Sequence, residues 1–89
     1  MSHFFRNVLN NMQFHAQLEM LRKRQRKSQK VVAELVGLSE RSVRAYEKNE
    51  RLPDLATLSL LLETLCASTY EAETIYEAWV SSQNENKHQ

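Results

Sequence analysis

The chain has 89 residues and a formal net charge of +1 at pH 7, with a single glycine, a single proline and a single cysteine. A chain of this length folds as one small domain, and its scarcity of glycine, proline and β-branched runs favours an all-α fold. No apolar run approaches the ~20 residues of a membrane-spanning helix, and the N-terminus lacks the basic and apolar regions typical of a secretory signal. The lone Cys66 excludes an internal disulfide and fits a reducing cytoplasm.

The charged residues are distributed unevenly along the chain. Between Leu21 and Arg51 there are ten Lys or Arg and four Glu, whereas from Leu52 onward there are six acidic residues and one lysine, Lys87. A basic run alone is equally consistent with an ordinary solvated surface. If the same basic run lies on a helical element that enters a DNA groove, it indicates instead a surface that faces phosphates.

Residues 1–12 are expected to form a short helical extension. Its apolar residues recur at helical spacing: Phe4, Phe5, Val8, Leu9 and Met12. Their stripe is out of phase with the next one, which begins at Phe14, so the spacing predicts a break near Asn10 and Asn11. The paired Phe4 and Phe5 need a partner, and two remain open: the C-terminal helix of the same chain, or a second subunit.

The helix-turn-helix domain is predicted to span residues 13–81, beginning with a helix over Gln13–Arg26. Residues 28–47 then read as two short helices with N-caps at Ser28 and Ser39. Gly37 stands between them, where a helix end favours positive φ. The residues expected to face inward are Val32, Ala33, Leu35 and Val36 on the first helix and Val43 and Tyr46 on the second. Two short helices around such a turn form a helix-turn-helix.

The second half of the chain predicts two further helices. Asp54, after Pro53, is placed to cap a helix that buries five leucines: Leu55, Leu58, Leu61, Leu62 and Leu65. Ser68 and Glu71 form a capping box for the last helix, whose apolar face includes Ile75 and Trp79. Residues 82–89 are polar and uncapped, and are predicted to be a disordered tail.

An ordered set of residues at fixed spacing resembles the Xre and phage-repressor (Cro/CI-like) helix-turn-helix family. The matching residues are Ser28-Gln29, Val32-Ala33, Gly37-Leu38-Ser39, Val43, Tyr46-Glu47 and Arg51-Leu52-Pro53. The resemblance covers roughly Leu18 to Ser68, and Asn49 stands where the family usually has glycine. It implies a five-helix, lambda-repressor-like DNA-binding domain, to which residues 1–12 add an extra short helix. It also implies a structural ion pair between Arg22 and Glu47.

The second helix of the motif would read DNA bases in the major groove. Its candidate base contacts are Glu40, Arg41, Ser42, Arg44 and Ala45. Arg41 and Arg44 are expected to bind guanine edges, although Arg44 could contact phosphate only, and Glu40 could either accept from cytosine or orient Arg44. The candidate phosphate contacts are Gln29, by resemblance, and Lys27, Lys30, Lys48 and Arg51.

The resemblance implies a sequence-specific transcriptional regulator, most simply a repressor, that binds a near-palindromic operator as a homodimer. The expected dimer interface comprises Ile75, Tyr76, Trp79 and Val80, with Phe4 and Phe5; alternatively, the last helix packs on its own domain.

The rival reading is a protein-interaction module on the same fold, such as an antitoxin or a phage-encoded protein that acts on a host protein. The three histidines form no ligand-spaced set, so no enzyme, metal, cofactor or small-molecule ligand is expected. The expected location is the cytoplasm of a bacterial or phage-infected cell.

Overall fold

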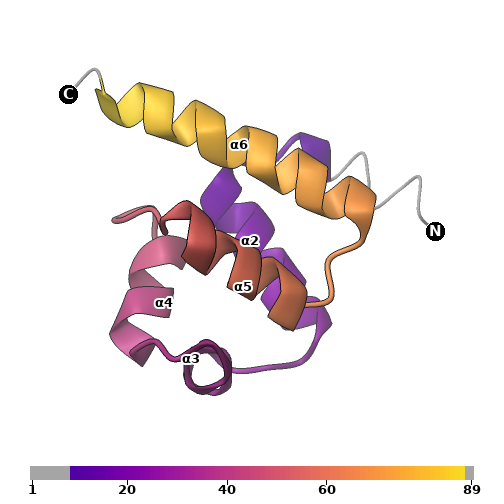
Figure 1. The fold of residues 1–89 in the computed structure, drawn as a ribbon, viewed down its shortest axis with the longest axis vertical. Coiled ribbons are helices and arrows are strands. Elements are labelled where there is room, and N and C mark those ends of the chain that lie inside the picture. Colours follow the sequence, from indigo (N-terminus) through magenta and orange to yellow (C-terminus); the bar gives the residue numbers. More distant parts are fainter. Residues whose placement is uncertain (1–8, 88–89) are drawn as a thin grey trace.

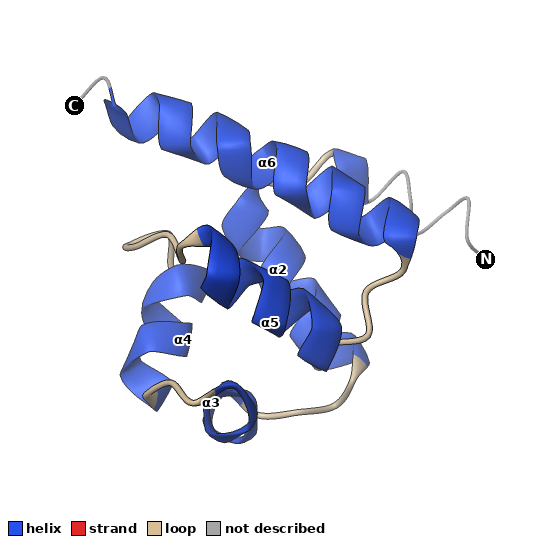
Figure 2. Ribbon diagram, in the orientation of Figure 1, coloured by secondary structure: helices blue, strands red, loops and turns tan. Residues whose placement is uncertain are grey.

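The structure, a computed structural model, describes residues 9–87 of the chain, and all regular structure in that range is helical (Figures 1 and 2). Five helices follow one another: α2 (Phe14–Arg24), α3 (Gln29–Val36), α4 (Glu40–Glu47), α5 (Leu55–Thr64) and α6 (Thr69–Lys87). The predicted all-α, five-helix fold is therefore confirmed. Phe4 and Phe5, and most of the predicted N-terminal extension, lie outside the described residues.

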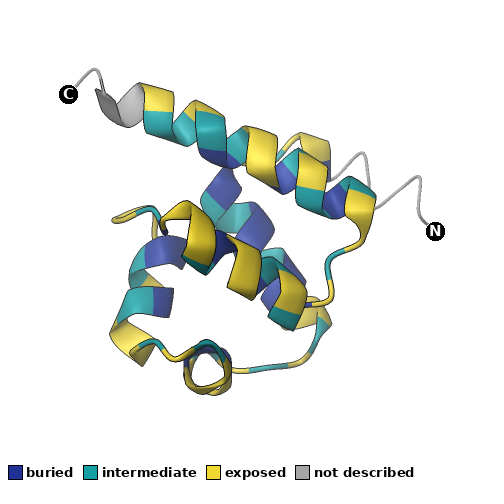
Figure 3. Ribbon diagram, in the orientation of Figure 1, coloured by how far each residue is buried: buried dark blue, intermediate teal, exposed yellow. Residues whose placement is uncertain are grey.

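The helices pack around one core, with α3 in contact with both α4 and α5 and α2 in contact with both α4 and α6. Helix α6 lies along one side of the domain and α3 along the opposite side, as Figure 1 shows. The buried faces of the helices turn toward the space between them (Figure 3). The core is made of Leu9, Phe14, Leu18, Leu21, Val32, Ala33, Val43, Tyr46, Leu58, Leu61, Leu65, Ile75 and Trp79.

The helices start where the sequence predicts caps. The Ser28 and Ser39 hydroxyls each accept a backbone N–H three residues on, at 3.1 Å, and the Asp54 carboxylate accepts one at 2.8 Å. At the start of α6, Glu71 accepts the Ser68 N–H at 2.9 Å, while the Ser68 hydroxyl accepts the Glu71 N–H at 3.1 Å. These bonds satisfy amides that have no partner within the helix, so the polar residues between the apolar stripes set the helix boundaries.

The turns depend on left-handed residues. Gly37 ends α3 with a φ of +76°, and Asn49 takes a φ of +63° after α4, as predicted for the position where the family has glycine. Two further left-handed residues, Arg26 at +57° and Cys66 at +58°, follow α2 and α5. Residues other than glycine are strained in the left-handed conformation. Neither arginine nor cysteine is typical of it, so the sequence does not predict left-handed residues at these two turns.

Two predicted core leucines are exposed instead. Leu35 on α3 is 59% exposed and Leu55 on α5 is 51% exposed. On α3, Val32 and Ala33 fill the face that meets the neighbouring helices. Leu35 lies about 100° around the helix axis from the middle of that face. Leu55 lies in the first turn of α5, at the edge of the stripe centred on Leu58. Both predictions were wrong because periodicity gives the direction of an apolar face but not its width.

Residues 9 and 10 are helical and a turn follows at 11 and 12, in agreement with the predicted break. Leu9 is fully buried in the core, and its carbonyl accepts the Gln17 side-chain amide at 2.7 Å. The Asn10 side chain donates to the Tyr70 hydroxyl at 2.8 Å. The beginning of the described chain is therefore tied to α2 and α6.

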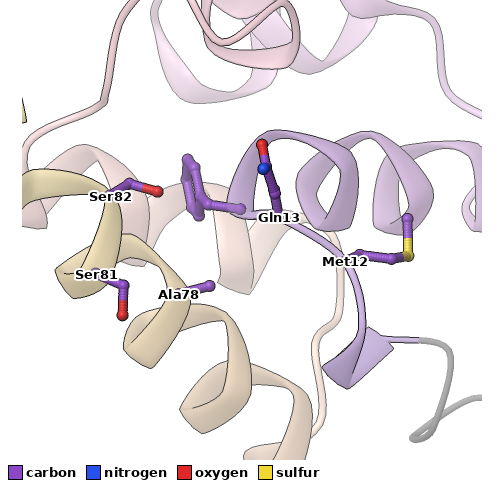
Figure 4. Close-up of a pocket in the computed structure, with 6 residues that line it drawn as sticks. Met12, Gln13, Ala78, Ser81 and Ser82 are labelled. Carbon is purple, nitrogen blue, oxygen red and sulfur yellow. The ribbon is translucent and has the colours of Figure 1, made fainter. Parts of the chain in front are cut away.

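Helix α6 continues to Lys87, so the predicted disordered tail is wrong for residues 82–87. No glycine or proline follows Pro53 to interrupt the helix, and the start of α2 partly covers Ser82. Ala78, Ser81 and Ser82 line a cleft of ≈ 210 Å³ together with residues at the start of α2. Figure 4 shows these three residues on α6 and Met12 and Gln13 on the neighbouring segment. Within residues 9–87, none of the helices has the length and hydrophobicity needed to span a bilayer.

The apolar face of α6 packs into the domain itself. Ile75 is fully buried and Trp79 is 6% exposed, and the Trp79 indole N–H donates to the Pro53 carbonyl at 2.8 Å. These two side chains are covered within one chain, which corrects their assignment to a dimer interface. Of the other α6 residues assigned to the dimer interface, Tyr76 is 44% exposed and Val80 is half-buried.

Candidate nucleic-acid interface

A buried carboxylate fixes the orientation of α4. Glu47, the last residue of the helix, accepts Arg22 Nε at 2.7 Å and Arg22 Nη2 at 2.9 Å. A third bond, from Gln29 Nε2 at 2.9 Å, reaches the same carboxylate from the start of α3. The side chains of Arg22 and Glu47 are only 11% and 3% exposed. Three helices therefore meet at Glu47, and the predicted ion pair between Arg22 and Glu47 is present as a bidentate contact.

The guanidinium is held on both sides. Arg22 Nη1 also donates to the Lys27 carbonyl at 2.8 Å, so this cation binds the loop before α3 as well as α4. The hydrogen bonds to Glu47 raise the pKa of the Arg22 guanidinium above its ordinary value, against the opposing effect of burial. Since each nitrogen of the Arg22 guanidinium donates a hydrogen bond to Glu47 or to the loop, the pair acts as a rigid joint between α2 and α4.

The face of α4 opposite to this joint points outward. Val43, Tyr46 and Glu47 are buried, whereas the predicted base contacts are accessible: Glu40, Arg41 and Arg44 are exposed, and Ser42 and Ala45 are half-buried. The Glu40 carboxylate lies 3.3 Å from Arg44 Nη2 across one helical turn. At this distance Glu40 can orient Arg44, which is one of the two roles considered for it. An exposed pair of this kind is weak and can open for a stronger partner.

A second network ties the start of α4 to the loop after it. Ser39 Oγ and Ser42 Oγ are hydrogen-bonded at 3.0 Å, and Arg51 Nη2 donates to Ser42 Oγ at 2.5 Å. The Arg51 guanidinium also lies 5.2 Å from the centre of the Tyr46 ring, a cation–π distance. The sequence indicated Arg51 only as a phosphate contact. Its fold-back was missed because it requires the turn at Asn49 that carries the loop back along α4.

The predicted phosphate contacts flank the two helices of the motif. Lys27 and Lys30 lie on either side of the α3 N-terminus, and Lys48 and Arg51 follow the α4 C-terminus. Lys27 is half-buried, and the other three are exposed. Gln29 is half-buried and uses one amide hydrogen on Glu47, which leaves the second for another acceptor.

One basic residue near the motif, Arg24, forms an ion pair with α6. Arg24 pairs with Glu71 through contacts of 2.5 Å and 3.1 Å, linking α2 to the start of α6. Burial alone would raise the pKa of the Glu71 carboxyl, but the bonds from Arg24 and Ser68 outweigh it and lower the pKa. Local sequence patterns do not reveal this pair, because its partners are 47 residues apart and lie in different helices.

Other chemistries would need a metal cluster or a larger pocket. No group of three or more His, Cys, Asp or Glu side chains is placed to hold a metal ion in the part of the chain that the structure describes. The cleft between α2 and α6, at ≈ 210 Å³, is smaller than the about 300–1,000 Å³ typical of ligand pockets.

Comparison with known families supports the same interpretation. A family model described as Helix-turn-helix matches residues 18–65, more than half of the chain. The match begins within α2 and runs through α3 and α4 to the end of α5. Comparisons with curated proteins and with solved structures give no match. The chain therefore belongs to the Xre- and Cro/CI-like helix-turn-helix family, and it is a DNA-binding regulator of that type.

Proposed function

We propose that this regulator is a repressor that binds a near-palindromic operator as a homodimer, with α4 in the major groove. The observation that supports it most directly is the two-sidedness of α4. One face is anchored through Glu47, and the other exposes Arg41 and Arg44. A helix that enters a groove needs its reading side chains free and its backbone fixed.

Each exposed residue of α4 has a proposed contact. Arg41 and Arg44 would each bind a guanine edge through paired hydrogen bonds, and Glu40 would hold Arg44 in position until DNA replaces it. Ala45 can contact a thymine methyl group. Ser42 reaches a base or a phosphate. Gln29, Lys27, Lys30, Lys48 and Arg51 are proposed to contact phosphates and so to fix the register of the protein on the duplex.

A homodimer follows from the length of DNA that one helix can read. Two copies of α4 separated by about 34 Å would read successive major grooves on one side of the duplex. We propose that Tyr76 and Val80 contribute to the interface, together with Phe4 and Phe5. Tyr76 is the exposed aromatic of α6, and its ring lies 5.7 Å from that of Trp79. The same side chain would serve the alternative function, in which α6 binds a toxin or a host protein.

The proposal is tested by selecting duplexes from a random pool with the purified chain, at moderate salt. Repression predicts a selected site with two half-sites about one helical turn apart, and a reporter carrying that site upstream should lose expression when the chain is present. Sedimentation with and without the duplex gives the number of chains bound. Binding without preference for any duplex would instead favour the protein-interaction function. The proposed location is the cytoplasm or nucleoid of a bacterial or phage-infected cell.

A further inference from the structure

The Ser42 hydroxyl lies at the centre of the network at the start of α4. Its oxygen accepts Arg51 Nη2 at 2.5 Å and is hydrogen-bonded to Ser39 Oγ at 3.0 Å. Ser39 Oγ, in turn, accepts the Ser42 backbone N–H at 3.1 Å. Arg51 is held in place by the buried Tyr46 ring beneath it, so the arrangement restrains side chains from the N-cap, the helix and the following loop.

These contacts determine what the hydroxyl has left to offer. A serine hydroxyl has two acceptor lone pairs and one donor hydrogen. Arg51 occupies one lone pair of Ser42 Oγ, and the bond to Ser39 uses either the second lone pair or the hydroxyl hydrogen. Ser42 is half-buried on α4, next to exposed Arg41. Two of the three hydrogen-bonding positions of this hydroxyl are therefore taken, and one remains for DNA.

We propose that Arg51 is a positioning residue for base recognition: with Ser39, it holds the Ser42 hydroxyl so that its one remaining hydrogen-bonding position meets a base edge. The inference rests on the proposed function, because it requires α4 in the major groove. Each base pair presents its own pattern of donors and acceptors there, so a hydroxyl held in one orientation discriminates among them. Arg51 would thus influence sequence preference, in addition to any phosphate contact made by its remaining donors.

The test measures affinity for the selected duplex and for each single base-pair variant of it, by fluorescence anisotropy with the full chain. The variants are Ser42→Ala, Arg51→Ala and the double substitution. Lys48→Ala serves as the matched control, since Lys48 is an exposed cation beside α4 outside the network. Far-UV circular dichroism shows that each variant is folded. Arg51→Lys is included as well, because it keeps the charge but loses the planar fork of donors.

We expect Ser42→Ala and Arg51→Ala to reduce discrimination at the same base pair by about three- to tenfold, the range of one neutral hydrogen bond. The double substitution should reduce it no further. Arg51→Lys should lose the same discrimination and keep the slope of affinity against salt. Lys48→Ala should weaken binding to all duplexes alike and lower the salt slope by about one phosphate contact.

Three results would overturn the inference while leaving the proposed function intact. Arg51→Ala could retain full discrimination at the base pair that Ser42→Ala affects. The two substitutions could act at different base pairs. Ser42→Ala could weaken all duplexes equally, which would show that the hydroxyl binds a phosphate. A wild-type chain with no preferred duplex would overturn the proposed function, and this inference with it.

Discussion

The joint at Glu47 should be worth a large share of the stability of the domain. Replacing Glu47 with leucine leaves the Arg22 guanidinium buried, with the Lys27 carbonyl as its one remaining hydrogen-bond acceptor and the half-exposed Glu19 carboxylate 3.9 Å away. It also removes the acceptor of the Gln29 amide. Loss of one partner of a buried ion pair costs about 3–5 kcal/mol. At about 0.05–0.15 kcal/mol per residue, a chain of this size has about 4–13 kcal/mol in total. The single substitution should therefore remove about a quarter or more of the free energy of unfolding.

Replacing both partners should be much less harmful. In Arg22→Met/Glu47→Leu no charge remains buried, and apolar side chains of similar volume fill the space, so we expect a cost within about 2 kcal/mol of wild type. Urea unfolding provides the measurement, followed by circular dichroism at 222 nm and by fluorescence of Trp79, the only tryptophan in the chain. Coincidence of the two signals tests the two-state assumption.

An exposed ion pair in α2, the helix of Arg22, supplies the control. Lys23 Nζ lies 3.3 Å from the Glu19 carboxylate, and the two side chains are 67% and 40% exposed. Lys23→Met should change the free energy of unfolding by less than about 0.5 kcal/mol. The reasoning is refuted if Glu47→Leu costs no more than this control, or if the double variant is as unstable as the single one.

Four further predictions follow from single positions. Gly37→Ala should cost about 1–2 kcal/mol in urea unfolding, because the strain comes from its φ of +76° alone, with no atom within 4 Å of an added Cβ. The Glu71 carboxyl has a folded pKa below its ordinary 4.5, so the stability it contributes is present above pH 4.5 and is lost as the pH falls through the folded pKa. Unfolding curves of Glu71→Gln should lack that part of the acid dependence; an unchanged dependence would contradict the role of the Arg24 pair. Arg41→Ala should relax preference at one base pair by about 1–3 kcal/mol in duplex titrations, and an equal loss on all duplexes would reassign it to phosphate. Tyr76→Glu should shift sedimentation toward monomers and weaken operator binding. An unchanged dimer would show that the interface lies elsewhere, for example at the exposed leucines of α5.

Much of the fold could be predicted because its signals are local. The serine caps, the left-handed Gly37 and the capping box at Ser68 each involve residues a few positions apart, where backbone geometry leaves few choices. The pairing of Arg22 with Glu47 is a long-range contact, and it was predicted only through resemblance to a family. Residue periodicity alone offered no reason to connect those two positions.

The errors come from contacts between distant segments. Leu35 is exposed because Val32 and Ala33 already fill the face of α3 that its neighbours cover. Ile75 and Trp79 were assigned to a second subunit, although the chain buries them itself. The role of Arg51 at Ser42 depends on the path of a loop. Each depends on which surfaces meet, and local patterning does not determine that.

The joint at Glu47 also has a consequence for how such a protein can be retargeted. Glu47 is anchored to Arg22 and Gln29, whereas Arg44 contacts Glu40 on the exposed side of the same helix. If α4 reads DNA as proposed, exchanging the side chains at Arg41 and Arg44 would therefore alter the operator that is chosen and leave the folding free energy nearly unchanged. New specificities can be explored one position at a time, on a frame that does not need to be rebuilt.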